Sequence, residues 1–160
     1  MSSPTGTTAR AQLAHLLEAE QRLIAQFVDL LGHEETLLIA GETDQVLALA
    51  QEKTALFQQL QRHHDARTML VGSLGGRNDD ASMRTLCAGQ TESLKHWDAI
   101  LELGRQAQAR NELNGKLIAE RMQHNQAALS VLLSAADQPQ LYDAEGSARP
   151  TGRGRHLGSA

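Results

Sequence analysis

The sequence has few aromatic residues and few prolines. Phe27, Phe57, Trp97 and Tyr142 are its only aromatic side chains and make up 2% of the 160 residues. β-Sandwiches and β-barrels depend on aromatic and β-branched residues, so this shortage counts against an all-β fold. Proline stands only at positions 4, 139 and 150, which leaves most of the chain without the residue that breaks helices. These absences favour an all-α fold.

Other absences limit where the protein can be located and what it can bind. The single cysteine, Cys87, cannot form an internal disulfide, and the N-terminus lacks the apolar segment of a signal peptide. No run of about 18 apolar residues is free of charge, as a membrane-spanning helix requires. The net charge is −4 and the basic residues are scattered, so a nucleic-acid backbone finds no basic patch. We expect a cytoplasmic protein that neither inserts into a membrane nor binds nucleic acid.

The apolar residues that are present recur at heptad spacing. Over residues 9–39, steps of three and four predict one long amphipathic helix that ends at Ala40 and Gly41. A second helix is predicted over 44–71, with Thr43 or Asp44 as its N-cap. The connection is short, so the two helices are predicted to pack as an antiparallel hairpin. The apolar positions of this hairpin are Leu13, Leu16, Leu23, Phe27, Leu30, Leu37, Val46, Leu49, Leu56, Phe57, Leu60 and Leu70.

Residues 72–80, GSLGGRNDD, have the composition of a loop, and Asp79 or Asp80 can cap the helix that follows. That third helix continues to about residue 136 and is longer than either of the first two. If it is unbroken, the fold is a three-helix antiparallel bundle, whereas a break near Gly89 or Gly104 adds a short helix. Both alternatives belong to the predicted fold class, an all-α antiparallel bundle of a helical hairpin and a very long C-terminal helix.

Pro139 ends the helical region, and the residues around and after it are rich in turn formers. We predict a disordered C-terminal tail there. The chain is therefore expected to divide into a flexible N-terminus at 1–8, a helical bundle at 9–136 and a flexible tail at 137–160.

No residue pattern predicts catalysis. Neither the zinc pattern His-Glu-x-x-His nor the di-iron pattern Glu-x-x-His occurs, so the seven histidines predict no metal site. Cys87 has no neighbouring base and is expected to be a small buried residue. The acidic residues of the hairpin show the pattern of a solvated helix face. They are Glu18, Glu20, Glu34, Glu35 and Glu42. We expect no enzymatic activity, no catalytic residue and no cofactor.

Large apolar residues on the last helix have two alternative roles. They do not share one narrow stripe, so a single partner face cannot cover them all. In the first alternative they are divided between the core and isolated exposed positions. In the second, the part of the helix beyond its shorter partners offers a groove to an amphipathic helix of a client. These residues are Leu113, Leu117, Met122, Leu129, Leu132 and Leu133.

Two segments near the C-terminus carry a family resemblance. Residues 111–132 contain Asn111, Asn114, Gly115 and Ile118 in an Asn-x-x-Asn-Gly-x-x-Ile pattern, followed by a Leu-rich stretch. Residues 141–146, LYDAEG, form a Tyr-Asp-x-x-Gly pattern. Together with the Gly-acidic turn GETD and the helix after it, this order of motifs resembles the FlgN-like flagellar export chaperones.

The resemblance implies a cytoplasmic chaperone with no enzymatic activity. Such a chaperone binds the C-terminal helices of the hook-filament junction proteins (hook-associated proteins), keeps them unpolymerised and delivers them to the type III export gate. The six apolar residues of the last helix are then the expected client-binding residues. Leu141 and Tyr142 are the expected contacts to the export gate, because core packing explains a lone aromatic in a turn-rich tail poorly. Docking of Tyr142 back onto the bundle is the alternative.

Asn111, Asn114 and Gly115 have a structural alternative to client contact. A small residue lets two helix backbones approach, and asparagine amides can bond to carbonyl groups, so we favour a helix crossing. The expected oligomeric state is a monomer or a weak homodimer. A self-associating helical scaffold or adaptor with no export role is the alternative function for the whole protein.

Overall fold

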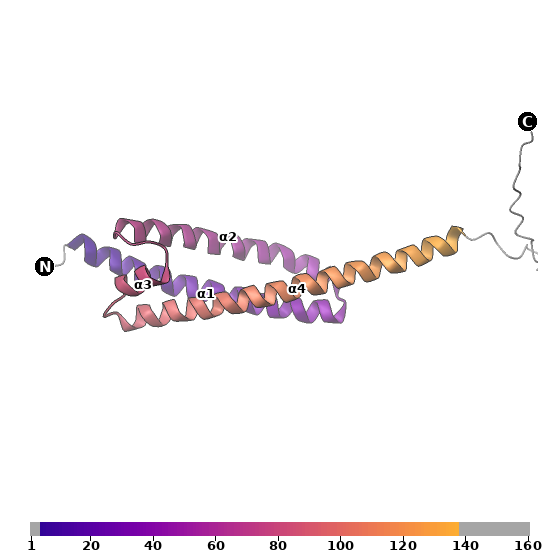
Figure 1. The fold of residues 1–160 in the computed structure, drawn as a ribbon, viewed down its shortest axis with the longest axis horizontal. Coiled ribbons are helices and arrows are strands. Elements are labelled where there is room, and N and C mark those ends of the chain that lie inside the picture. The colour runs from indigo at the N-terminus through magenta and orange to yellow at the C-terminus, as the bar shows by residue number, and fades with distance from the viewer. Residues whose placement is uncertain (1–3, 138–160) are drawn as a thin grey trace, which may run out of the picture. The chain divides into compact units, whose positions relative to one another are not determined.

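The computed structural model describes residues 4–137, and the burial of residues 6–135, as a chain of four helices (Figure 1). The helices are α1 (Pro4–Ala40), α2 (Thr43–Ser73), α3 (Asp80–Leu86) and α4 (Thr91–Asp137). No strand occurs in this range, so the predicted all-α class is confirmed. The chain falls into two compact units that divide after Ile118. The predicted bounds of an N-terminus, a bundle and a tail remain a prediction.

In unit 1, α1 and α2 form the predicted hairpin. Gly41 ends α1 with φ of 79°, a backbone conformation that glycine adopts readily, and the amide of Glu42 donates to the carbonyl of Leu37. The predicted N-cap of α2 is wrong. Glu42 occupies that position without a side-chain cap bond, and Thr43 is already helical. The conformation of Gly41 therefore shapes this turn, with no capping side chain.

The short helix α3 decides between the two predicted architectures. It precedes a turn at Gly89, where φ is 79°, and only then does α4 begin. Asp79 caps α3 as predicted, since its carboxylate accepts a 2.8 Å hydrogen bond from the amide of Ser82. Gly104 lies inside α4 and does not interrupt it. The bundle therefore contains the additional short helix, with the break at Gly89.

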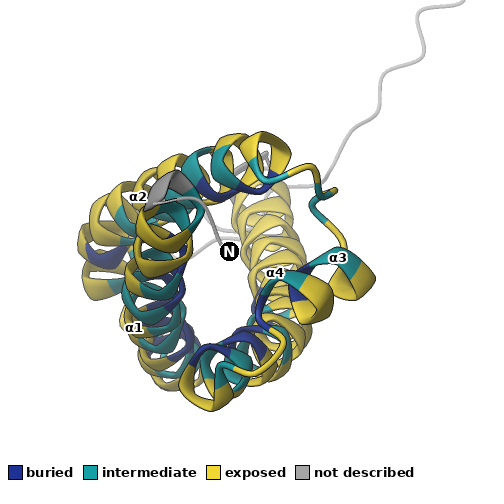
Figure 2. Cartoon of the chain, turned by 90° about the vertical axis from the view of Figure 1, so that its left-hand side faces the viewer, coloured by how far each residue is buried: buried dark blue, intermediate teal, exposed yellow. Residues whose placement is uncertain are grey.

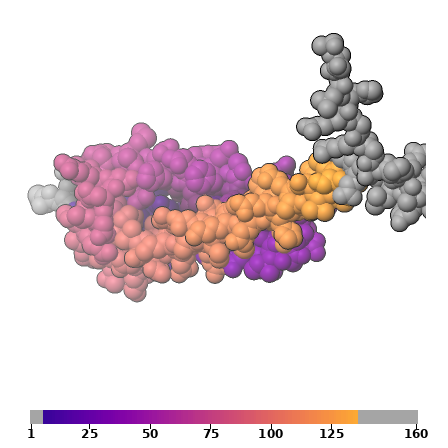
Figure 3. All heavy atoms as spheres, turned by 45° about the vertical axis from the view of Figure 1, so that its right-hand side comes forward, coloured from indigo at the N-terminus to yellow at the C-terminus, as the bar shows by residue number. Residues whose placement is uncertain are grey.

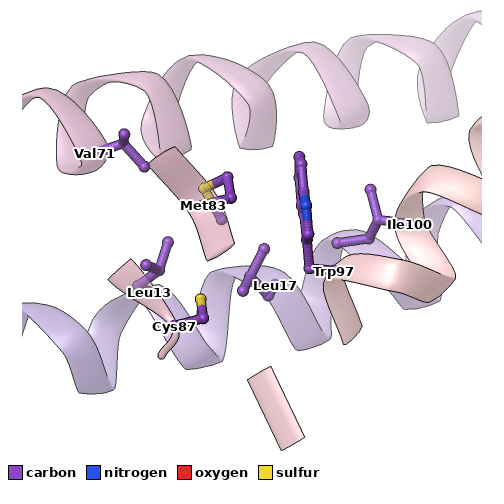
Figure 4. Close-up of a cluster of buried hydrophobic side chains, with 7 residues drawn as sticks. All are labelled: Leu13, Leu17, Val71, Met83, Cys87, Trp97 and Ile100. Carbon is purple, nitrogen blue, oxygen red and sulfur yellow. The ribbon is translucent and has the colours of Figure 1, made fainter. Parts of the chain in front are cut away.

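The core of unit 1 lies where α1, α2, α3 and the start of α4 meet (Figure 4). Cys87 is fully buried in it, as expected for a small core residue. The cluster consists of Leu13, Leu17, Val71, Met83, Cys87, Trp97 and Ile100. A second cluster near the hairpin turn contains Leu30, Leu37 and Leu49. Figure 2 shows the buried residues of the long helices facing the interior.

Unit 2 begins at Ala119, and its described part is the rest of α4 to Asp137. Every side chain from residue 119 to 135 is exposed. This part of α4 therefore has the backbone hydrogen bonds of a helix but no buried side chain.

Among the described residues, no helix combines the length and the apolar character that crossing a membrane requires. The predicted tail after residue 137, with Leu141 and Tyr142, lies outside the described residues.

Candidate functional site

The predicted client-binding residues are mostly exposed on α4. Leu113 in unit 1 is 43% exposed, and the fractions in unit 2 rise to 67% at Leu132, while Leu117 is half-buried. Met122, Leu129 and Leu133 lie between these values. The structure adds Ile118 and Val131, at 36% and 68% exposed, which the sequence had not singled out for binding. Their role in client binding stays a prediction, but exposed apolar groups at this density are typical of an interaction surface.

A group of buried hydrogen bonds around Glu34 joins α4 to the hairpin. The side-chain amide of Asn114 donates to the carbonyl of Leu31 and to Glu34 Oε1, both at 2.9 Å. Lys53 Nζ of α2 donates to the same carboxylate oxygen at 3.0 Å. Because Glu34 accepts from two helices at once, it links α1, α2 and α4 just before unit 2 begins.

Two acidic residues that were expected on a solvated face are in fact buried. Glu20 is 4% exposed and Glu34 is 3% exposed, so that expectation is wrong for both. Each faces a basic residue of α2, Arg67 for Glu20 and Lys53 for Glu34. The sequence did carry a signal, because positions 20 and 34 continue the heptad of apolar residues on α1.

The buried pair of Glu20 and Arg67 connects α1 and α2 farther from the hairpin turn. Arg67 Nε lies 3.0 Å from Glu20 Oε2, an ion pair by distance, although the N–H is not directed at the oxygen and makes no hydrogen bond. Burial raises the pKa of Glu20, and the charge of Arg67 opposes that rise. The guanidinium also lies 4.9 Å above the ring of Trp97, whose Nε1 donates to Asp80 at 2.7 Å. Through these contacts α1, α2, α3 and α4 are connected.

Asn111 and Gly115 take no part in the buried hydrogen bonds around Glu34. Both are exposed, and a Cβ added at Gly115 would meet no atom within 4 Å. Of the three residues predicted at a helix crossing, Asn114 alone joins two helices in the described structure. The crossing role of the set stays a prediction.

An open groove runs between α2 and α4, with α1 as its floor. Two adjacent hollows of about 340 and 270 Å³ share Phe27 of α1, Phe57 of α2 and Ala107 of α4. Phe57 was predicted among the apolar positions of the hairpin, but its side chain is 58% exposed. In Figure 3 the gap between the two helices shows α1 beneath it. α4 leaves this side open because it contributes the small residues Gly104 and Ala107.

The described residues show little catalytic chemistry. No group of three His, Cys, Asp or Glu side chains that could hold a metal occurs among them. Burial raises the pKa of the Cys87 thiol, which disfavours the thiolate that a nucleophile needs. What the geometry offers is exposed apolar surface on α4 and in the groove.

The chain is similar to proteins of flagellum synthesis. A family model described as FlgN protein matches residues 1–150. Two relatives, both named Flagella synthesis protein FlgN, come from Salmonella typhimurium (strain LT2) and Salmonella typhi. Each is 25% identical over 145 residues, which cover 89% of this chain and 94% of the relative. No solved structure matches the chain significantly.

Proposed function

The chain belongs to the FlgN family, and on that premise we propose that it binds the C-terminal helical segments of hook-filament junction proteins as an export chaperone. It keeps these hook-associated proteins unpolymerised in the cytoplasm and delivers them to the type III export gate. The family has a chaperone-type role in flagellum synthesis and is not a known enzyme family. The identity of the client and the contact to the gate are the proposed parts.

The exposed apolar side chains of α4 support client binding most directly. A client that polymerises through terminal amphipathic helices has an apolar face that must be covered before assembly. Leu129 and Leu132, exposed on a helix, can bury that face without ATP or a metal. Fully burying one leucine contributes about 1.5–3 kcal/mol, so burying all six predicted side chains supplies roughly 9–18 kcal/mol, part of which the cost of association removes.

The first test replaces these leucines by a charged residue. Leu129→Asp and Leu132→Asp are each expected to abolish the heat of binding when a C-terminal peptide of a hook-associated protein is titrated calorimetrically. A carboxylate placed in an apolar contact costs several kcal/mol or keeps the contact wet. Because both leucines are more than half exposed in the free chain, the thermal melting of both variants should stay close to that of the parent.

Ser130→Asp is the matched control, since it introduces the same charge at an adjacent exposed position. It should bind the peptide with nearly parental affinity. If both leucine variants retain binding, or if no such peptide binds the parent, the chaperone proposal fails and the scaffold alternative is favoured.

The second test concerns delivery. Truncation after Gln138 removes Leu141 and Tyr142 and is expected to weaken binding to the cytoplasmic domain of the export gate. About 20 residues of extended chain can span roughly 70 Å, enough for a contact beyond the bundle. Client affinity should change little. Loss of client affinity with unchanged gate affinity would show that the tail was assigned to the wrong partner.

A further inference from the structure

The groove between α2 and α4 continues the position that α3 occupies at one end of unit 1. There α3 lies between the two helices, and its Met83 belongs to one buried cluster with Val71 of α2 and Trp97 of α4 (Figure 2). Nearer the hairpin turn, the hollows of the groove open between residues 53–64 of α2 and 104–111 of α4. α3 has only seven residues, so no described helix of unit 1 fills this stretch. Unit 1 is therefore a four-helix arrangement whose fourth helix is present at one end only.

The groove has the dimensions and the walls that suit a short helix. Residues 53–64 of α2 span roughly 16 Å at about 1.5 Å per residue, which corresponds to three helical turns. α4 contributes Gly104 and Ala107, and a Cβ added at Gly104 would meet no atom within 4 Å. Such small side chains allow a second helix to approach closely. The ring of Phe57 is exposed on the opposite wall and is available to pack against that helix.

The charged groups on the walls of the groove are paired within the chain. Apart from His64, the ionisable lining residues are Glu20 and Lys53. Glu20 faces Arg67, and Lys53 faces Glu34. A charged side chain inserted here would be taken out of water without an ion-pair partner of its own, which is unfavourable. The other polar lining residues are neutral: Thr54, Gln61, Gln108 and Asn111. The groove therefore favours an uncharged apolar surface.

We propose that this groove binds one amphipathic helix of the client, which takes the vacant place of the fourth helix. The proposal rests on the proposed function, which gives the client a C-terminal helix with an apolar face to be covered. Over about three turns, the face that enters the groove carries apolar side chains and no lysine, arginine, aspartate or glutamate. All lining residues belong to unit 1, so this client contact is separate from the exposed leucines of unit 2.

Filling the groove is the first test. Gly104→Leu adds a side chain where a Cβ meets no atom, and leucine favours a helix more than glycine does, so the full chain should fold at least as stably as the parent. Its affinity for the C-terminal peptide of a hook-associated protein, measured by calorimetry, should fall at least about tenfold, because the leucine takes space that the client helix needs. Gly72→Leu is the matched control. A Cβ at Gly72 also meets no atom, but Gly72 lies outside both hollows, so this variant should keep parental affinity.

Removing the exposed ring is the second test, and it adds no atoms that could disturb folding. Phe57→Ala should weaken peptide binding roughly tenfold, as truncation of a central aromatic residue does in other interfaces. Its thermal melting should stay close to that of the parent, because the ring is more than half exposed in the free chain. Leu47→Ala is the control, since Leu47 is an exposed apolar residue of α2 outside both hollows. It should bind like the parent.

Salt tests the chemistry of the face that enters the groove. An apolar contact is not screened by ions, so the factor by which Phe57→Ala weakens binding should be the same at about 0.05 M and about 0.5 M NaCl. A factor that shrinks severalfold at the higher concentration would mean an ionic contact and would overturn the proposal.

The groove and the proposed function can fail separately. If the parent binds the peptide but either groove variant keeps parental affinity, or if a control loses as much affinity as its groove variant, the groove is not the binding site. The chaperone proposal then stands on the leucine variants alone. If no hook-associated peptide binds the parent, the proposed function fails and the groove proposal fails with it.

Discussion

At the scale of single residues, Glu34 is the carboxylate on which three helices converge. Glu34→Ala removes the acceptor of Lys53 Nζ and one of the two acceptors of the Asn114 amide. We expect the free energy of unfolding to fall by about 1–3 kcal/mol in urea denaturation, because buried polar groups lose their partner.

The neighbouring residue provides the control. Glu35 is partly exposed and lies 3.9 Å from Arg110, a pair of the kind that contributes under about 1 kcal/mol. Glu35→Ala should therefore change stability much less than Glu34→Ala. Equal effects of the two substitutions would mean that the hydrogen bonds of Glu34 do not hold α4 to the hairpin.

Glu20 should make stability depend on pH in the direction opposite to most carboxylates. Burial raises its folded-state pKa above the ordinary 4.5, so its side chain favours folding most below that value. That contribution is lost as the pH rises through the raised pKa. Glu20→Gln cannot ionise, so its stability relative to the parent is expected to increase between pH 4 and pH 7 in urea titrations.

Glu92→Gln is the control with the opposite sign. Lys95 lowers the pKa of Glu92, so the stabilising effect of that carboxylate is present above its ordinary value and lost as the pH falls. The relative stability of Glu92→Gln should therefore not rise with pH. If the two variants show the same trend, the burial of Glu20 is not the cause.

At the scale of helices, the cap of α3 is made by a side chain and the cap of α2 is not. Asp79→Ala removes the bond to the Ser82 amide and should lower the unfolding temperature. Glu42→Ala at the N-cap of α2 should have almost no effect, since no side-chain cap bond is lost there. Thermal denaturation of both variants under one condition makes the comparison.

A substitution at Gly115 of α4 tests whether this position lies at a helix crossing or on an open helix face. A Cβ there would meet nothing within 4 Å, so Gly115→Ala should stabilise the chain by about 0.5–1 kcal/mol through helix propensity alone. The measurement is urea unfolding in dilute solution. A loss of stability would instead support the predicted close crossing at this position.

The helices were largely predictable from the sequence, and their caps and faces were less so. Heptad spacing gave the hairpin and the long third helix because apolar periodicity directly reports a buried stripe. It did not show which residues of α4 beyond Trp97 face the hairpin. In the structure Asn114 is buried, whereas Gly104, Gln108 and Asn111 are exposed.

At the scale of the whole molecule, the buried polar contacts could not be predicted because they join residues far apart in the sequence. Glu34 and Asn114 meet across 80 positions, and heptad spacing cannot say which charged residue of one helix faces which residue of another. The groove could not be predicted either, because it forms where α1, α2 and α4 leave space between them. The exposed apolar face of α4 was predictable, since the bundle has too few helices to cover all its leucines.

α4 changes character along its length, and hydrogen exchange should reveal the change. Up to Asn114 its amides are held by a helix that packs on the hairpin, whereas from residue 119 to 135 no side chain is buried. An unpacked helical stretch of this length is only marginally stable in water, so its amides open by local fraying. In dilute solution we expect deuterium uptake to be slow before residue 115 and fast after 119. Uniform protection along α4 would contradict this. One helix would then combine a permanently folded half with a half that gains most of its order only when it is bound.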